Sequence, residues 1–283
     1  MKIILTGKTG FIGSFLSDYF ARKGFEVSGI GRKDFRLGEE HLAGLIEGND
    51  VLINLAGAPI IKRWTRRYTR IIWKSRVDTT RMLTGALKLL RTRPKVFISS
   101  SAVGIYAGEG HHTESKHQLS DDFLGTLCQR WEEEANKAAF MLPVYILRSG
   151  IVLGKEGGAL PQMSLPFKLG VGGKLGTGRQ GLSWIHIVDY ARALEMIIEK
   201  QPSQTIFNFT APHPVSNAAF SKTLAKTLGK PNLFSVPGFA LRILYGKGAE
   251  TLLGGQFAYP ENLEKAGYQF QFASLKQALE DLL

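Results

Sequence analysis

The first thirteen residues, MKIILTGKTGFIG, constrain the fold of this chain more than any other stretch. A short apolar run, Ile3 to Leu5, leads into three glycines spaced G-x-x-G-x-x-G, and an amphipathic segment from Phe11 to Arg22 follows at once. A strand, a glycine turn and a helix in this order build a dinucleotide site, because the turn admits a pyrophosphate and the helix N-terminus offers it free N–H groups. We therefore predict a dinucleotide bound by the residues of this turn: Gly7, Lys8, Thr9, Gly10, Phe11, Ile12 and Gly13.

Strand and helix patterns alternate through the first two hundred residues. Short Val/Ile/Leu-rich runs predict buried strands, and longer amphipathic runs between them predict helices near 11–23, 39–47, 65–91 and 121–140. This order is typical of an α/β protein with a doubly wound parallel sheet, the Rossmann arrangement. Ligands of such sheets lie at the carboxyl ends of the strands, so we expect three residues at the end of the third strand to face the dinucleotide: Asn54, Ala56 and Gly57.

The composition of the sequence changes after Gly150, and the regular strand and helix pattern is interrupted. Residues 154–181 are rich in glycine and predict an irregular segment that borders a site, with a long surface linker as the alternative. Helices are expected near 216–228, 237–252 and 274–282. We predict a dinucleotide-binding unit of residues 1–153 and 183–210, and a smaller α-rich substrate unit of residues 154–182 and 211–283.

Composition narrows the class of protein. No apolar run approaches the roughly 20 residues that cross a bilayer, and Met1 leads directly into a strand, so we expect a cytoplasmic protein without a leader. Cys128 is the only cysteine, which excludes an internal disulfide. The net charge of +12 favours anionic ligands.

Many of the basic residues fall between Lys62 and Arg76, interleaved with aromatic side chains. Such a mixture can bind nucleic acid. The aromatics recur at helical spacing, however, so they can face a core while the cations stay in water. We interpret the segment as a solvated helix and expect no nucleic-acid partner.

Five ordered motifs carry a family resemblance: TGKTGFIG at 6–13, NLAG at 54–57, SSSAVGIY at 99–106, LRSGIVLG at 147–154 and SWIHIVDYARA at 183–193. In this order they resemble the extended short-chain dehydrogenases/reductases, in their sugar-nucleotide epimerase/dehydratase branch. RWT at 63–65, SRV at 75–77 and LCQRWEEEA at 127–135 are similar to an atypical, epimerase-like subfamily. The tail resembles the C-terminal domain of unknown function that accompanies that subfamily. The resemblance covers the whole chain and implies a nicotinamide dinucleotide.

The end of the second predicted strand bears on the choice of coenzyme. NAD enzymes usually place an acid there to bind the ribose 2′-hydroxyl, whereas this strand ends Gly29-Ile30-Gly31-Arg32-Lys33. A guanidinium pairs well with a 2′-phosphate, so we predict NADP, bound by Arg32. NAD remains the alternative, because Asp34 follows shortly.

Catalytic residues depart from the family pattern. The resemblance implies a Tyr-x-x-x-Lys pair for proton transfer, yet the matching helix, Phe123 to Glu132, contains neither residue. We predict Ser101 as a substrate-orienting hydroxyl and Tyr106 as a proton donor, with a packing role equally open for Tyr106. Cys128 is expected to be a buried inert thiol, and His186 to brace its segment by hydrogen bonding.

No metal is expected, because the pair His111-His112 lacks helical ligand spacing and a third ligand. Two functions follow from these patterns. The first is an NADP-dependent oxidoreductase or epimerase-like enzyme that acts on a small molecule. The second is a non-catalytic NADP-binding sensor or assembly module, which would explain why the Tyr/Lys pair is missing.

Overall fold

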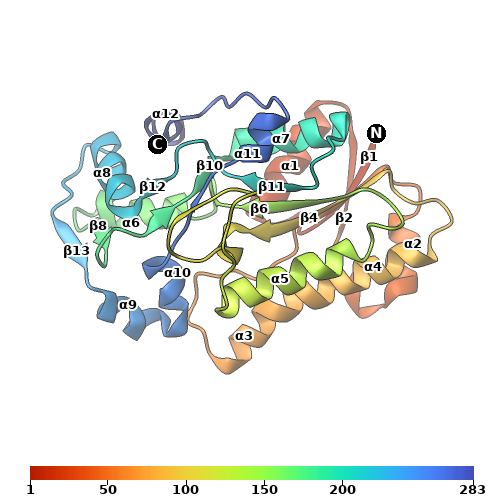
Figure 1. The fold of residues 1–283 in the computed structure, drawn as a ribbon, viewed down its shortest axis with the longest axis horizontal. Helices are drawn as coiled ribbons and strands as arrows, with labels where there is room; N and C mark the ends of the chain where they lie inside the picture. Colours follow the sequence, from red (N-terminus) through yellow and green to blue (C-terminus); the bar gives the residue numbers. More distant parts are fainter.

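The computed structural model describes all 283 residues. Its centre is a six-stranded sheet in the order β11-β6-β4-β3-β1-β2, in which every neighbouring pair is parallel (Figure 1). The bounds of these strands are β1 Lys2–Thr6, β2 Glu26–Ile30, β3 Val51–Asn54, β4 Val96–Ala102, β6 Val144–Ser149 and β11 Ile206–Phe209. The predicted doubly wound α/β fold is confirmed.

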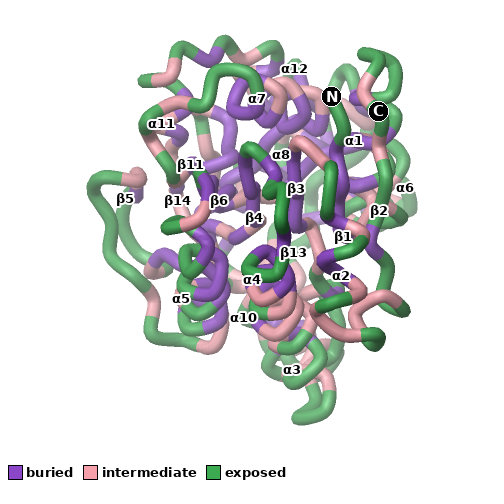
Figure 2. Tube along the Cα trace, turned by 90° about the vertical axis from the view of Figure 1, so that its right-hand side faces the viewer, coloured by how far each residue is buried: buried purple, intermediate pink, exposed green.

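Helices cover both faces of the sheet. Helices α1 (Phe11–Arg22) and α7 (Ile187–Lys200) pack on one face, and α2 (Glu39–Ile46), α4 (Thr79–Leu89) and α5 (Phe123–Asn136) pack on the other (Figure 1). The inner strands are therefore buried between two helical layers, as the burial colouring in Figure 2 shows, whereas the edge strand β2 is largely exposed. Strands covered on both sides are apolar throughout rather than alternating, which explains the continuous Val/Ile/Leu runs in the sequence.

The direction of winding reverses beside β1. The chain passes from β1 to β2 at one edge and then returns to place β3 on the other side of β1. A parallel sheet opens a crevice where two neighbouring connections leave in opposite directions, outside the carboxyl ends of the strands. Here the crevice lies between the turns that follow β1 and β3, which are the turns predicted to bind the dinucleotide.

A second group of elements forms a smaller unit beside the sheet, at the left of Figure 1. Two short strand pairs tie it together: β9 with β12, and β8 with β13. Its core is a separate cluster that includes Trp184, Phe220 and Leu279. The bounds are α6 Leu160–Lys168, β8 Gly173–Leu175, β9 Gly181–Leu182, β12 Val215–Ser216, α8 Asn217–Thr227, β13 Phe234–Val236, α9 Gly238–Tyr245, α10 Glu250–Leu253 and α12 Leu275–Leu282.

Three predictions of local structure need correction. Residues 154–181 are not an irregular segment, since they contain α6, β8 and part of β9. The helix expected over 65–91 is three pieces: α3 (Arg66–Trp73), a π-helical turn (Lys74–Asp78) and α4. The helix expected over 237–252 is interrupted at Gly246, whose φ of 59° a helix does not accommodate, so that α9 and α10 are separate.

The tail also crosses back to the sheet, which differs from the predicted domain boundaries. Strand β14 (Phe257–Ala258) pairs with β5 (His111–His112), and α11 (Glu261–Lys265) follows it. Leu263 and Tyr268 belong to the main core cluster of the sheet rather than to the smaller unit. Residues after 210 are therefore shared between the two units.

Two further short strands, β7 (Ile151–Leu153) and β10 (Trp184–His186), pair in parallel at the junction of the units. Single-turn 3₁₀ helices occur at Asp34–Arg36, Val103–Ile105 and Lys247–Ala249. None of the helices is both long enough and apolar enough to cross a membrane.

Candidate active site

The glycine turn after β1 has the geometry of an anion cradle. Gly7 has a φ of 70°, and its carbonyl accepts the N–H of Gly10 at 2.9 Å. A Cβ on Gly13 would overlap the Gly7 carbonyl, and one on Gly10 would lie 3.2 Å from it. Side chains are thus excluded, and helix α1 begins after Gly10 with no side-chain cap on its free N–H groups. These residues fit a diphosphate.

A cavity of about 570 Å³ opens from this turn. It runs past the turn after β3 and the end of β4 to helix α5, and on to the segments around α6 and α10 of the smaller unit. The predicted residues that line it are Gly7, Gly10, Phe11, Ile12, Gly13, Ala56, Gly57 and Ser101. The crevice and the smaller unit therefore enclose one continuous site.

Phe11 joins the glycine turn to the segment that follows β7. Its ring packs so closely on three glycines that a Cβ on any of them would come within 2.8 Å of it: Gly154, Gly157 and Gly158. That contact explains why residues 154, 157 and 158 are glycines. Residues 154–158 therefore pack on the first turn of α1 and are not part of an unpacked surface linker.

Two predicted binding residues of the glycine turn point elsewhere. The Nζ of Lys8 donates to the Val27 carbonyl at 2.8 Å, and its aliphatic stem lies over Gly29 of β2. Thr9 is exposed. Neither residue lines the cavity.

Asn54 is fully buried at the end of β3 and supports the crevice from behind. Its Oδ1 accepts the hydroxyl of Thr6 at 2.8 Å, and its Nδ2 donates to Thr80 at 2.7 Å. Thr6 in turn accepts the backbone N–H groups of Leu55 and Ala56, both at 3.0 Å. The Asn54 side chain therefore fixes the two strand ends relative to each other, and the cavity is lined by the residues after it.

Ser101, at the end of β4, is the predicted catalytic residue that reaches the cavity. It is buried, and its hydroxyl donates to Glu132 Oε1 at 2.6 Å. Glu132 lies on α5 and forms a paired contact with Arg148 of β6: Nε donates to Oε1 at 2.9 Å and Nη2 to Oε2 at 2.7 Å. Because Ser101 gives its proton to Glu132, its oxygen is left to accept a hydrogen bond from a ligand hydroxyl.

Tyr106 is not brought to the cavity. Its ring is fully buried, and its hydroxyl donates to Asn208 at 2.7 Å and accepts from Arg148 at 2.9 Å. Burial raises the pKa of the Tyr106 phenol, with the charge of Arg148 acting against this. The structure therefore places Tyr106 in the packing role that the sequence left open, as a link behind Arg148.

Helix α5 presents its apolar and thiol side chains to the cavity. Cys128 lines it, and burial raises the pKa of its thiol to about 12, so this sulfur is an inert thiol at neutral pH. Glu132 follows four residues later, at the spacing of the family's Tyr and Lys. Arg130 points outward and pairs with Glu133 at 2.7 Å. The helix contributes no cation to the site.

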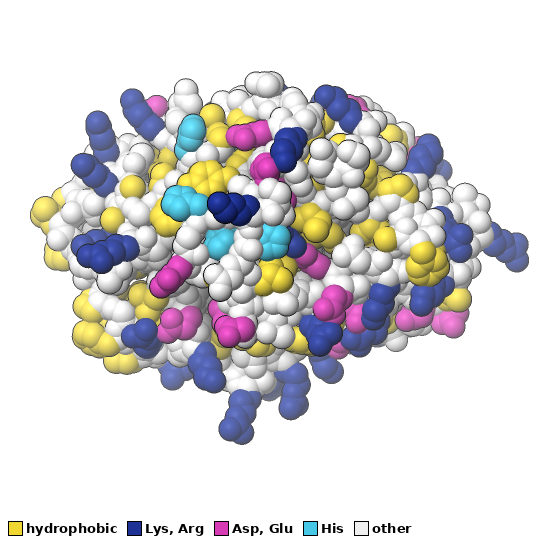
Figure 3. Space-filling model, viewed as in Figure 1, with side chains coloured by type: hydrophobic (Ala, Val, Ile, Leu, Met, Phe, Trp, Pro, Cys, Tyr) yellow, Lys and Arg dark blue, Asp and Glu magenta, His cyan; other side chains and the backbone are white.

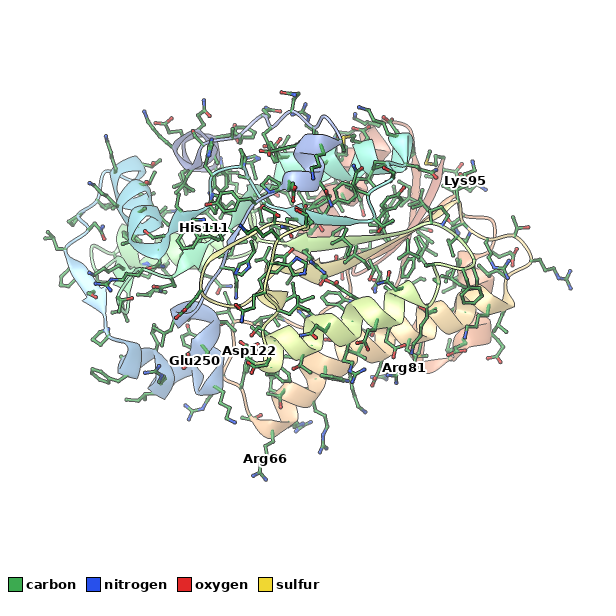
Figure 4. All side chains as sticks on the ribbon, viewed as in Figure 1. Arg66, Arg81, Lys95, His111, Asp122 and Glu250 are labelled. Carbon is green, nitrogen blue, oxygen red and sulfur yellow. The ribbon has the colours of Figure 1, made fainter.

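In the basic segment Lys62–Arg76 the aromatic side chains pack toward the core and the cations face water, as predicted, with one exception. Trp64 packs against Phe123 near the start of α5, their ring centroids 5.3 Å apart. Arg66 projects outward from the tip of α3 (Figure 4), and Lys and Arg side chains line the lower rim of the molecule in Figure 3. Arg76 instead turns inward and lines the cavity.

Sequence reasoning missed three residues of the site: Arg76, Glu132 and Arg148. Arg76 was hidden within a run of surface cations. Arg148 is a charged residue in an otherwise apolar strand, and a buried charge needs a partner, which is the signal that could have pointed to Glu132.

Comparison with known proteins decides the family. Residues 3–209 match the NAD dependent epimerase/dehydratase family, and residues 236–282 match a domain of unknown function, DUF1731. The chain belongs to the NAD dependent epimerase/dehydratase family. Within it, the two matched regions together make this an atypical, extended short-chain dehydrogenase/reductase.

Individual members of the family support this assignment. The epimerase family protein SAR0825 of Staphylococcus aureus is 36% identical over 100% of this chain and 99% of its own length. The crystal structure of human epimerase family protein SDR39U1 with NADPH is 30% identical, with a TM-score of 0.89, over 100% of this chain and 99% of that one. UDP-glucuronic acid 4-epimerase of Bacillus cereus, 19% identical over 100% of this chain and 98% of that one with a TM-score of 0.77, shares the fold.

Proposed function

We propose that this protein binds NADP(H) in the crevice between β1 and β3 and acts on a small molecule as an oxidoreductase or epimerase-like enzyme. The observation that carries the choice of NADP is the charge at the end of β2. Arg32 and Lys33 are exposed there. Asp34, the acid that would serve NAD, is engaged within its own surface turn: its Oδ2 accepts the Gly31 N–H at 2.7 Å and its Oδ1 lies 3.2 Å from His41 Nε2.

The residues present fit this coenzyme. The glycine turn and the uncapped start of α1 would hold the diphosphate, and the Arg32 fork suits a 2′-phosphate. The bound coenzyme would supply hydride transfer. Ser101, held by Glu132, would accept a hydrogen bond from a substrate hydroxyl and orient it at the end of β4. The human relative SDR39U1, solved with NADPH, supports the proposal.

The test compares NADPH and NADH on matched charge reversals. Arg32→Glu places like charge beside the 2′-phosphate, so we expect the Kd for NADPH to rise by about tenfold or more and that for NADH to change little. Arg36→Glu, an exposed arginine on the following 3₁₀ turn, is the control and should alter neither. Equal losses for both coenzymes, or no binding of either by the wild type, would overturn the proposal.

A second candidate, a non-catalytic NADP-binding sensor, is favoured by the cavity lining. No Asp, Glu, His, Lys or Tyr side chain lines it, and burial raises the pKa of the one cysteine that does, Cys128, to about 12, so the lining holds no group that exchanges a proton readily at neutral pH. Incubating the NADPH complex with carbonyl compounds and sugar nucleotides separates the two. Coenzyme oxidation would support the enzyme, whereas tight binding without turnover across the set would support the sensor.

A further inference from the structure

Arg76 is the only side chain with a full charge among the residues that line the cavity. It lies in the π-helical turn between α3 and α4. Its Nη2 donates to the Ala58 carbonyl at 3.0 Å, and its Nη1 makes only long contacts, 3.4 Å each, to the Ile72 carbonyl and the Ser75 hydroxyl. It forms no salt bridge with a carboxylate, and the ionisable groups that act on its charge are Cys128 and Tyr68.

The guanidinium lies between the crevice and helix α5. On one side, a Cβ on Gly57 would come within 2.9 Å of Nη2, so the group lies against the turn that follows β3. On the other side, its central carbon is 5.4 Å from the centre of the Trp131 ring. Burial lowers the pKa of Arg76. A charge in this position without a counter-ion is costly, and an anionic ligand group would offset that cost.

Helix α5 explains why a cation is needed from elsewhere. The resemblance implies that the family's lysine holds the nicotinamide ribose from this helix. Glu132 stands at the lysine spacing after Cys128, and its carboxylate is engaged by Arg148 and Ser101. The π-helical turn that packs against α5 therefore supplies the one positive charge among the residues that line the cavity.

We propose that Arg76 binds an oxyanion in the cavity, and that this oxyanion is the phosphate on the nicotinamide half of the coenzyme. The inference rests on the proposed function. Strand β1, which leads into the glycine turn, lies between β2 and β3 in the sheet. Arg32 follows β2 on one side, and Arg76 contacts the turn after β3 on the other. Arg32 and Arg76 thus lie on opposite sides of the diphosphate cradle. A substrate carboxylate has the same chemistry, so the experiment must distinguish the two sources.

The experiment measures binding of four probes by calorimetry: NADPH, NADH, reduced nicotinamide mononucleotide and adenosine 2′,5′-bisphosphate. Arg76→Met keeps the apolar contact with Trp131 and removes the charge. We expect it to weaken NADPH and NADH by the same factor, about tenfold to a hundredfold, to weaken the nicotinamide mononucleotide likewise, and to leave the bisphosphate unchanged. Arg32→Glu should show the opposite selectivity between the two half-molecules.

Two further variants control for folding and for charge. Arg70→Met removes an exposed cation from α3 and should change no affinity. Arg76→Lys keeps the charge but loses the planar fork, so we expect an intermediate loss, and it provides the measurement if the methionine variant does not fold.

The remaining outcomes would contradict the proposal in different ways. Equal loss of the bisphosphate would show a general distortion of the site. Unchanged coenzyme affinities, with benzoate binding to the NADPH-saturated wild type and not to Arg76→Met, would assign Arg76 to a substrate carboxylate. Unchanged affinities without benzoate binding would leave Arg76 a brace for the Ala58 carbonyl. A wild type that binds neither NADPH nor NADH would instead overturn the proposed function itself.

Discussion

At the scale of single residues, buried polar side chains form one connected path away from the cavity wall. Arg148, which holds Glu132 behind Ser101, donates to Tyr106, and Tyr106 donates to Asn208. The path continues to the tail, because Asn208 donates its side-chain amide to the Tyr259 carbonyl at 2.9 Å. Each of these side chains is hydrogen-bonded to the next. Buried polar groups are tolerated in a protein core when they have such partners.

Glu114 at the end of this path gives a pH-dependent prediction. Its Oε1 accepts the backbone N–H of Asn208 at 2.7 Å, while its Oε2 is buried without a partner. Burial raises the pKa of Glu114 above 4.5. As the pH rises past 4.5, the unfolded chain ionises at this residue before the folded chain does, so folding loses stability until the folded-state pKa is passed.

Glu114→Gln cannot ionise and keeps the accepting oxygen. We expect it to melt at a higher temperature than the wild type at neutral pH, with the difference shrinking as the pH falls toward the ordinary glutamate range. Melting curves over a pH series test this, and Glu109→Gln, an exposed neighbour, should show no such trend. A glutamine variant that is less stable at neutral pH, with a deficit that disappears as the pH falls, would show that the Glu114 charge supports the fold.

At the scale of elements, local patterns predicted what depends on neighbours in sequence. The strand, glycine turn and α1 were predictable because apolar runs, glycines and helix periodicity all lie within Lys2–Arg22. The inward turn of Arg76 was not, because its direction is set by α5, which packs against that helix from far along the chain. The same holds for Gly154–Gly158, whose role depends on the ring of Phe11.

Helix α7 shows how an element and the tail depend on each other. Asp189, fully buried in its first turn, accepts the Tyr268 hydroxyl at 2.7 Å and the backbone N–H groups of Gln271 and Phe272 at 2.9 and 2.8 Å. His186, which caps the helix by accepting the Val188 N–H, stacks on Phe272 with ring centroids 3.8 Å apart. His186 therefore braces the start of α7 and the tail, rather than the glycine-rich segment that it was expected to hold.

Asp189→Ala should release the tail from α7. It removes the carboxylate that accepts the Tyr268 hydroxyl, the buried Phe272 N–H and the part-buried Gln271 N–H, so we expect a loss of about 3 kcal/mol in the free energy of unfolding, measured by urea titration. Asp281→Ala is the matched control. It removes the half-exposed partner of His186 and should cost less than about 1 kcal/mol. Equal losses would mean that Asp189 does not hold the tail.

At the scale of the whole molecule, the two units are interleaved along the chain. The main core cluster draws on residues up to Phe209 and again on Leu263 and Tyr268, while the cluster of the smaller unit contains Leu160, Phe220 and Leu279. The chain thus passes repeatedly between the units, and the cavity is walled by both. Neither unit can open fully without withdrawing segments that the other needs.

This arrangement predicts one cooperative unfolding transition, although proteins of two units commonly show two. Trp184 reports on the smaller unit and Trp131 on helix α5, so single-tryptophan variants that retain one or the other should give coincident fluorescence melts, matched by far-ultraviolet circular dichroism. NADPH at about 100 times its Kd should stabilise the protein by roughly 2.7 kcal/mol and shift both melts together. Separate transitions, or a shift confined to the Trp131 signal, would show that the units unfold independently and that the smaller one does not respond to the coenzyme.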